Sequence, residues 1–136
     1  WRNLLATKEL TRCNNRWSEA QFNSFIRSTL RKASMRWPPK NEVLSKARLE
    51  RGIYLCATGH QAPASIKIDG KRVNNILVDH LIPIVDPSTG FNTWGDFING
   101  LFCDSDNLQV LCKSCHDIKS KEERATATAR NKKKED

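Results

Sequence analysis

Cysteine usage limits most narrowly what this chain can fold into. The 136 residues include five cysteines, an odd number, and two of them form the pair Cys112-x-x-Cys115. A framework in which every cysteine is paired in a disulfide needs an even number. A single C-x-x-C pair, without a secretory leader pattern at the start of the chain, is typical of a metal site in a reducing compartment. We therefore expect a cytoplasmic protein with a metal centre rather than a disulfide scaffold.

Positive charge is concentrated in the N-terminal part of the chain. The sequence carries 23 Lys and Arg against 15 Asp and Glu, a formal net charge of +8. Residues 1–53 hold 12 basic and four acidic residues, whereas residues 54–136 hold 11 of each. A basic segment beside a neutral one is expected of a protein that binds a polyanion. No apolar run approaches the roughly 18 residues of a membrane-spanning helix, so we expect no membrane partner.

The basic segment has the periodicity of two helices. Ser18 and Gln21 form a capping-box sequence, and apolar residues then recur at helical spacing. Trp37-Pro38-Pro39 ends this first helix, because proline cannot continue the hydrogen-bond ladder. A second helix is expected to begin after a cap at Asn41 and to end at Gly52.

Basic side chains of this segment could neutralise the phosphates of a nucleic acid. Such contacts hold a protein on the backbone without reading its sequence. The alternative is a solvated basic face with no specific partner. We expect residues 1–53 to form a helical arm that binds nucleic acid. The candidate contact residues are Arg27, Arg31, Lys32 and Arg36, together with Lys119 further along the chain.

From residue 54 onward the pattern changes to short strands and short helices. A hairpin is expected around Asp69-Gly70, and a strand over Asn75–Asp79. Thr93 can cap a short helix, and a closing helix is expected from about Lys113. The pattern predicts an α+β domain over residues 54–125. Residues 126–136 have low complexity and end in a charged run, so a disordered basic tail is expected there.

Two stretches carry residue types that are used in metal-dependent hydrolysis. They read Val78-Asp79-His80-Leu81-Ile82-Pro83 and Asn107-Leu108-Gln109-Val110-Leu111-Cys112-Lys113-Ser114-Cys115-His116-Asp117-Ile118-Lys119. The first stretch resembles the opening of an HNH endonuclease site, and the second resembles its close. The three letters of the family name fall on His80, Asn107 and His116. The resemblance covers about residues 54–125 and does not extend to the basic segment.

The resemblance implies a ββα-metal core, in which two antiparallel strands and a closing helix hold one divalent cation. Asp79 and His116 would bind this ion, which would be Mg²⁺ or Mn²⁺, or else Ni²⁺ or Zn²⁺. His80 would be the general base, because a neutral imidazole can take a proton from water near physiological pH. Asn107 would either fix the loop that holds the base or join the metal shell.

The resemblance also implies a second, structural zinc held by two C-x-x-C pairs. Cys112 and Cys115 form the second pair, whereas the first is represented by Cys56 alone, with Gly59 where another cysteine is expected. His60 is favoured as the fourth ligand because zinc accepts Cys₃His sets. Cys103 is the competing ligand, unless it is a buried apolar residue.

The function that follows from the resemblance is that of a metal-dependent DNA endonuclease, similar to small bacteriophage HNH and homing-type enzymes. It would act on double-stranded DNA in the host cytoplasm, by nicking one strand or, as a dimer or in a second event, by cutting both. One alternative is a zinc-stabilised nucleic-acid-binding module with a vestigial HNH site. Another is an accessory nuclease of phage DNA packaging with a packaging partner.

Overall fold

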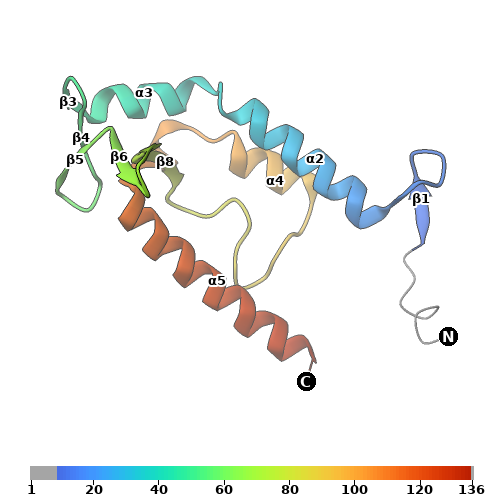
Figure 1. Ribbon diagram of the computed structural model, residues 1–136. Helices are drawn as coiled ribbons and strands as arrows, with labels where there is room; N and C mark the ends of the chain where they lie inside the picture. The colour runs from blue at the N-terminus through green and yellow to red at the C-terminus, as the bar shows by residue number, and fades with distance from the viewer. Residues whose placement is uncertain (1–8, 136) are drawn as a thin grey trace. The chain divides into compact units, whose positions relative to one another are not determined.

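Two compact units make up the protein, one ending at Met35 and the other beginning at Arg36. The computed structural model describes residues 9–135 (Figure 1). In the first unit, strand β1 (Leu10–Arg12) pairs antiparallel with β2 (Trp17–Ser18), and helix α2 (Glu19–Ser34) follows. The backbone N–H of Gln21 donates to the Ser18 hydroxyl, and the Ser18 N–H donates to the Gln21 side chain. The predicted capping box is therefore confirmed.

The second unit begins with helix α3 (Pro38–Ala47), which differs from the helix expected after Asn41. Pro38 and Pro39 occupy its first turn, where a missing N–H costs no intrahelical hydrogen bond. The helix ends at Ala47 rather than near Gly52, because the next residues form a strand. Gly52 lies in the turn after that strand with a φ of +80°, which favours glycine.

A small three-stranded antiparallel sheet follows α3. Its strands are β3 (Arg48–Glu50), β4 (Ile53–Leu55) and β5 (Gln61–Pro63), in the order β3-β4-β5. The sheet fixes the two ends of the loop between β4 and β5. Cys56 and His60 lie in this loop, and the Cys56 N–H donates to the His60 carbonyl.

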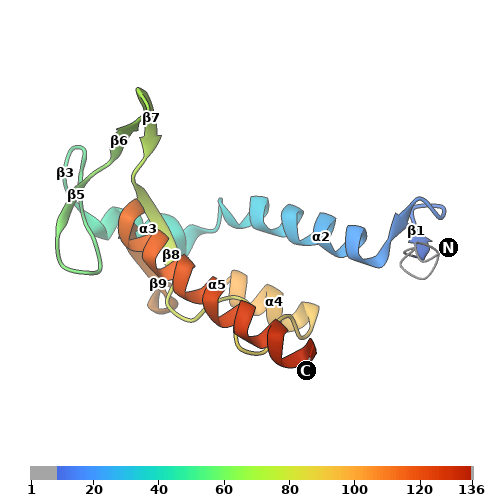
Figure 2. The ribbon, with the colours of Figure 1, turned by 60° about the horizontal axis from the view of Figure 1, so that its bottom comes forward.

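A separate hairpin consists of β6 (Ser65–Ile68) and β7 (Lys71–Asn74), which form a two-stranded antiparallel sheet. Asp69 and Gly70 form its turn, both with positive φ. Two such residues in succession match the tight turn that Asp-Gly favours, so the predicted hairpin is confirmed. Figure 2 shows the hairpin projecting beyond the strand that follows it.

The next strand pair leads directly into the longest helix. Strand β8 (Ile76–His80) pairs antiparallel with β9 (Leu108–Cys112), with Ile76 opposite Cys112 and His80 opposite Leu108. Helix α5 (Lys113–Glu135) begins where β9 ends. The segment between the strands contains α4 (Trp94–Leu101), capped by Thr93 as expected, and the 3₁₀ turn η1 (Ser105–Asn107). The unit is thus α+β.

The unit boundary and the tail differ from the expected division at residues 53 and 125. Helix α3 packs through Val43, Leu44 and Ala47 against the core, so it belongs to the C-terminal unit. That buried cluster comprises Cys56, Ala62, Ile76, Val110, Leu111 and Cys112. The segment expected to be a disordered tail continues α5 to Glu135. Its alanine, arginine and lysine residues are good helix formers, and low complexity did not prevent helix formation.

Buried Asn75 connects three parts of the C-terminal unit. Its side chain donates to the Pro63 carbonyl at 2.9 Å and accepts from the Lys113 N–H at 3.3 Å. Its backbone N–H donates to the Ala64 carbonyl, and its carbonyl accepts from the same Lys113 N–H at 2.9 Å. One residue therefore joins the end of β5, the base of the hairpin and the start of α5.

We predict that Asn75→Ala lowers the free energy of unfolding by about 1–3 kcal/mol, because the Pro63 carbonyl loses its side-chain donor inside the fold. Denaturant unfolding followed by circular dichroism measures this change. Asn99→Ala removes an exposed amide on α4 and is expected to stay within about 0.5 kcal/mol of the wild type. Equal stability of the two variants would contradict the role of Asn75.

Candidate functional site

Four side chains from separate elements of the C-terminal unit lie close together. The ligand atoms of Cys56, His60, Cys112 and Cys115 all lie within 4.8 Å of one another. The first two residues lie in the loop between β4 and β5, the third ends β9, and the fourth lies in the first turn of α5. Among the side chains that the structure describes, these four make up the one group of three or more Cys, His, Asp and Glu residues that could hold a metal ion.

The spacing inside this Cys₃His cluster fits a tetrahedral ion. Nε2 of His60 lies 3.2 Å from Sγ of Cys112. Two ligands at about 2.0 and 2.3 Å from one tetrahedral zinc lie roughly 3.5 Å apart. Cys103 is not in the cluster, and its carbonyl accepts a hydrogen bond from the Trp37 indole N–H at 2.7 Å. Of the two residues considered as fourth ligand, the structure places His60 with the three cysteines.

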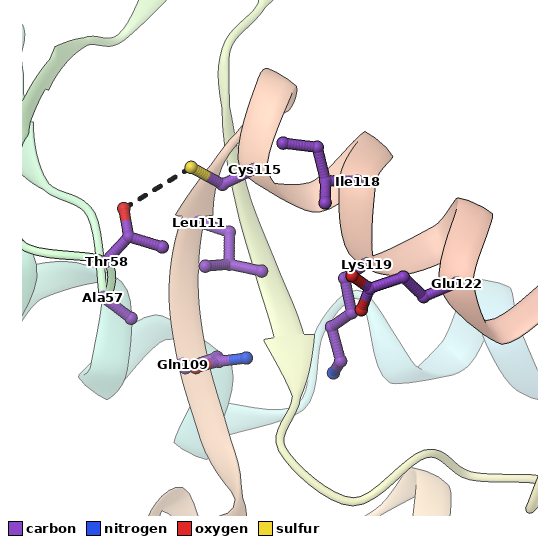
Figure 3. A pocket seen from close by; sticks show the side chains of 8 residues that line it. All are labelled: Ala57, Thr58, Gln109, Leu111, Cys115, Ile118, Lys119 and Glu122. Atoms are coloured by element: carbon purple, nitrogen blue, oxygen red, sulfur yellow. Dashed lines mark hydrogen bonds between the residues drawn. The ribbon is translucent and has the colours of Figure 1, made fainter.

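Thr58 orients the ligands from outside the cluster. Its hydroxyl oxygen lies 2.9 Å from Nδ1 of His60, 3.1 Å from Sγ of Cys56 and 3.4 Å from Sγ of Cys115. Figure 3 shows the contact with Cys115. Because the Thr58 hydroxyl contacts Nδ1, the Nε2 atom of His60 faces the sulfur atoms. Hydrogen-bond partners beyond the ligands commonly orient metal-binding histidines in this way. Thr58 is not among the site residues predicted from the sequence, although a hydroxyl midway between Cys56 and His60 is a signal that could have found it.

The thiol of Cys112 is poised to ionise. Burial by itself opposes ionisation, but hydrogen bonds from the Ser114 hydroxyl and from the backbone and thiol of Cys115 outweigh it. Together they lower the pKa of Cys112 to about 7. The thiolate is the form of cysteine that binds metals. A cation at this position would meet a ligand that is already substantially charged near neutral pH.

A second group of polar side chains lies on one face of the β8–β9 pair. Oδ1 of Asp79 is 3.7 Å from Nε2 of His116. Oδ2 of Asp79 accepts hydrogen bonds from the Lys119 ammonium and, at 3.3 Å, from the Gln109 amide. Lys119 also donates to the carbonyl of His80. Lys119 was expected to contact phosphate, and in this structure it pairs with Asp79.

His80 points to the other face of β8, as alternation along a strand requires. Its side chain is largely buried, the residue being only 8% exposed, and its Nε2 lies 3.1 Å from the carbonyl oxygen of Leu101. A carbonyl can only accept, so Nε2 carries the proton and Nδ1 is the basic nitrogen of the neutral ring. Burial lowers the pKa of His80, and the hydrogen bond to Leu101 opposes this shift without cancelling it.

Asn107 holds the chain that leaves β8. Its side-chain oxygen accepts from the Ile82 N–H at 3.0 Å, and its carbonyl accepts from the Leu81 N–H at 2.8 Å. These are the two residues that follow His80. Of the two roles considered for Asn107, these contacts correspond to fixing the loop beside the expected base.

The basic residues of the expected arm fall in both units. Arg27, Arg31 and Lys32 lie on α2 in the first unit, with Arg31 and Lys32 exposed and Arg27 half-buried. Arg36 is exposed and begins the second unit. The structure therefore assigns three of the four candidates to the N-terminal unit and one to the unit that holds the Cys₃His cluster.

A small pocket separates the Cys₃His cluster from the Asp79 group. It has a volume of about 200 Å³, with Thr58 and Cys115 on one side and Gln109 and Lys119 on the other (Figure 3). Leu111 lies in its wall between them. The cluster and the polar group are thus two neighbouring features on β9 and the first turns of α5.

Comparison with known proteins identifies no family for this chain. A scan against protein-family models, a search of curated proteins and a search of solved structures each gave no match. Separately, no helix within residues 9–135 is both long and apolar enough to cross a bilayer. Function is therefore inferred from the chemistry of the side chains.

We predict that the purified, reduced protein contains about one equivalent of zinc, because the four clustered side chains form a Cys₃His set. Cys112→Ser and His60→Ala should each lower the zinc content and the melting temperature, since binding energy at such a site is folding energy. Elemental analysis and thermal unfolding measure the two effects.

Cys103→Ser is the matched control, because it removes a thiol outside the cluster. We expect it to retain the full zinc content. Loss of zinc from Cys103→Ser, with zinc retained by His60→Ala, would show that the fourth ligand had been assigned wrongly.

Proposed function

We propose that this protein is a metal-dependent endonuclease that hydrolyses phosphodiester bonds in double-stranded DNA. The observation that carries the proposal is the pairing of Asp79 and His116, whose Oδ1 and Nε2 atoms face each other at 3.7 Å across β8 and α5. The proposal is supported by the order of motifs that resembles HNH endonucleases and by the net charge of +8.

Asp79 and His116 are the residues that would hold the divalent cation. Two ligands about 2.0–2.2 Å from one ion can be 3.7 Å apart, so the separation fits a shared metal. Oδ2 of Asp79 is bonded to Lys119 and Gln109, which leaves Oδ1 as the metal-facing oxygen. A bound divalent ion would act as a Lewis acid that stabilises charge on the leaving oxygen. The mixed oxygen and nitrogen set suits Mn²⁺, Ni²⁺ or Zn²⁺ and also admits Mg²⁺.

His80 is the proposed general base. Its hydrogen bond to the Leu101 carbonyl selects the tautomer in which Nδ1 can accept a proton from water. Its lowered pKa keeps the ring neutral at physiological pH, as a base must be before it acts. Asn107 supports this role as a positioning residue, because it holds the backbone of Leu81 and Ile82.

Lys119 would supply positive charge beside the reacting phosphate. Its ammonium lies between the Asp79 carboxylate and the His80 carbonyl, next to both residues of the proposed chemistry. A lysine side chain is flexible, so the same ammonium can contact a phosphate oxygen while it remains near Asp79. This arrangement would combine the observed ion pair with the phosphate contact expected from the sequence.

The Cys₃His cluster is the proposed structural zinc site. It would fasten the first turn of α5 to the loop between β4 and β5 through Cys115. His116 is the next residue, and Lys119 follows one turn later, so the zinc would set the position of both side chains. The metal in this cluster would have no open coordination position for substrate, as is usual for structural zinc.

One observation favours a different function, namely a zinc-stabilised nucleic-acid-binding module whose HNH-like site is inactive. The ammonium of Lys119 already neutralises Asp79, and no third acidic or cysteine ligand within residues 9–135 joins Asp79 and His116. A site with only two protein ligands has to take its remaining ligands from water and substrate. Measurement of DNA cleavage distinguishes the two functions.

The test is relaxation of supercoiled plasmid with Mg²⁺ or Mn²⁺ added or withheld. We predict metal-dependent nicking by the wild type and a loss of at least about 10²-fold in rate for His80→Ala, the low end of what a general base contributes. Asp79→Asn should also lose activity because it removes the charge that faces His116. The control is Asp117→Asn, which removes an exposed carboxylate from α5 that pairs with Lys113.

Equal nicking by the wild type, His80→Ala and Asp79→Asn would contradict the proposed roles of these residues. Salt-sensitive binding of duplex DNA without any cleavage in either metal would support the binding module instead.

A further inference from the structure

The β6–β7 hairpin presents positive charge that none of the ion pairs among the described side chains neutralises. Lys67 lies directly opposite Arg72 in the cross-strand register, and both side chains are exposed. Like charges directly opposite each other destabilise a strand pair. The ion pairs found among residues 9–135 include neither of them, nor the exposed Lys71 beside the turn. An anion placed along this ribbon would remove the repulsion.

The two faces of the hairpin have different character. Ile66 and Ile68 line a cavity of about 420 Å³ that also includes residues of β5 and the first turn of α5. Side chains alternate along a strand, so Lys67 and its partner Arg72 lie on the opposite face. The basic face is therefore turned away from the body of the C-terminal unit.

Hydrogen bonds of two asparagines hold the base of this two-stranded hairpin. Asn74 donates to the Ile76 carbonyl at 2.8 Å and accepts from the Ile76 N–H at 3.2 Å. Asn75 next to it bonds to Pro63, Ala64 and Lys113, as described above. An isolated two-stranded hairpin is marginally stable at best, so this anchoring matters. It fixes the ribbon at the start of β8, the strand that carries Asp79.

We propose that the β6–β7 hairpin is a DNA-contacting ribbon that lies in the major groove of the duplex, with Lys67 and Arg72 on backbone phosphates. This inference rests on the proposed function and names a contact surface outside the basic N-terminal segment. A two-stranded β-ribbon fits the major groove of B-DNA, which is about 12 Å wide. The major groove of an RNA duplex is too narrow and deep to admit it.

The chain limits how far this contact can be from the cleaved bond. Asp79 follows Arg72 by seven positions, so their Cα atoms are at most about 24 Å apart. Base pairs stack at about 3.4 Å, so this backbone span equals roughly seven base pairs, and the reach of the two side chains extends it to about one helical turn of roughly ten base pairs. The ribbon and the hydrolytic site would then engage the same turn of the helix.

The experiment measures binding of the full chain to a 30-base-pair DNA duplex over a range of salt concentrations, without divalent metal. We expect Lys67→Gln/Arg72→Gln to weaken binding about tenfold and to flatten the slope of log K against log salt by about 2. Lys132→Gln/Lys133→Gln removes the same charge from exposed positions near the end of α5 and is the matched control. It should change the slope by less than about 0.5. Circular dichroism and zinc content verify that each variant is folded.

The ribbon proposal would be overturned if Lys67→Gln/Arg72→Gln kept the wild-type salt slope. It would also be overturned if both double variants lost the same amount of affinity. Tight binding of an RNA duplex with the same loss in the hairpin variant would also overturn it. Ethylation interference within about one helical turn of the nick, absent in the hairpin variant, would support it. If the hairpin variant alone loses binding but the wild type never nicks plasmid, the ribbon stands and the nuclease assignment fails. If nicking is metal-dependent but the hairpin variant binds DNA as the wild type does, the nuclease assignment stands and the ribbon proposal fails.

Discussion

The structure depends most on the association of Cys56 and His60 with Cys112 and Cys115. These two pairs are more than 50 residues apart in the sequence, and their ligand atoms lie within 4.8 Å. Cys56 and Cys112 are also members of the buried core, so the Cys₃His cluster and the hydrophobic core are one structure. The buried residues are few, and a small core supplies limited stability without further support. A metal ion bound by these four side chains would provide that support. Because the site exists only in the folded protein, unfolding would release the ion.

The chemistry proposed for this protein is arranged along α5. Its first turn contains Cys115 of the cluster and His116, which faces Asp79 on β8. Near its other end, the guanidinium of Arg130 donates to the Pro87 carbonyl at 3.0 Å and so holds the loop that follows β8. One helix thus connects the cluster, the polar group and that loop. At its N-terminal end, strand β8 is connected through Asn75 to the basic β6–β7 hairpin.

Features with a local physical cause could be predicted from the sequence. Ser18 and Gln21 satisfy backbone groups within four residues of each other, and Asp69-Gly70 forms its turn from its own dihedral preferences. Thr93 likewise caps a helix that begins at the next residue. The cluster was also expected, because the resemblance to HNH endonucleases implied a structural zinc site with Cys56, Cys112 and Cys115, and zinc chemistry favoured His60 over Cys103 as the fourth ligand.

Features that arise from contacts between distant segments could not be predicted in this way. Helix α3 stops at Ala47 because residues 48–50 pair with β4, and it joins the C-terminal unit because Val43 and Leu44 meet the core. Asn75 reads as an ordinary turn or strand residue until its partners Pro63 and Lys113 are brought beside it. The pairing of Lys119 with Asp79 likewise depends on how α5 crosses β8. The separation of the two units after Met35 has no clear signal in composition.

The account depends on a metal bound by three sulfur atoms and one imidazole nitrogen, which X-ray absorption at the zinc edge measures directly. For the reduced protein we predict three sulfur neighbours at about 2.3 Å and one nitrogen neighbour at about 2.0–2.1 Å. The His60→Cys variant should shift the spectrum to four sulfur neighbours. A folded wild-type protein that binds no zinc would contradict the account, as would a spectrum with four sulfur neighbours in the wild type.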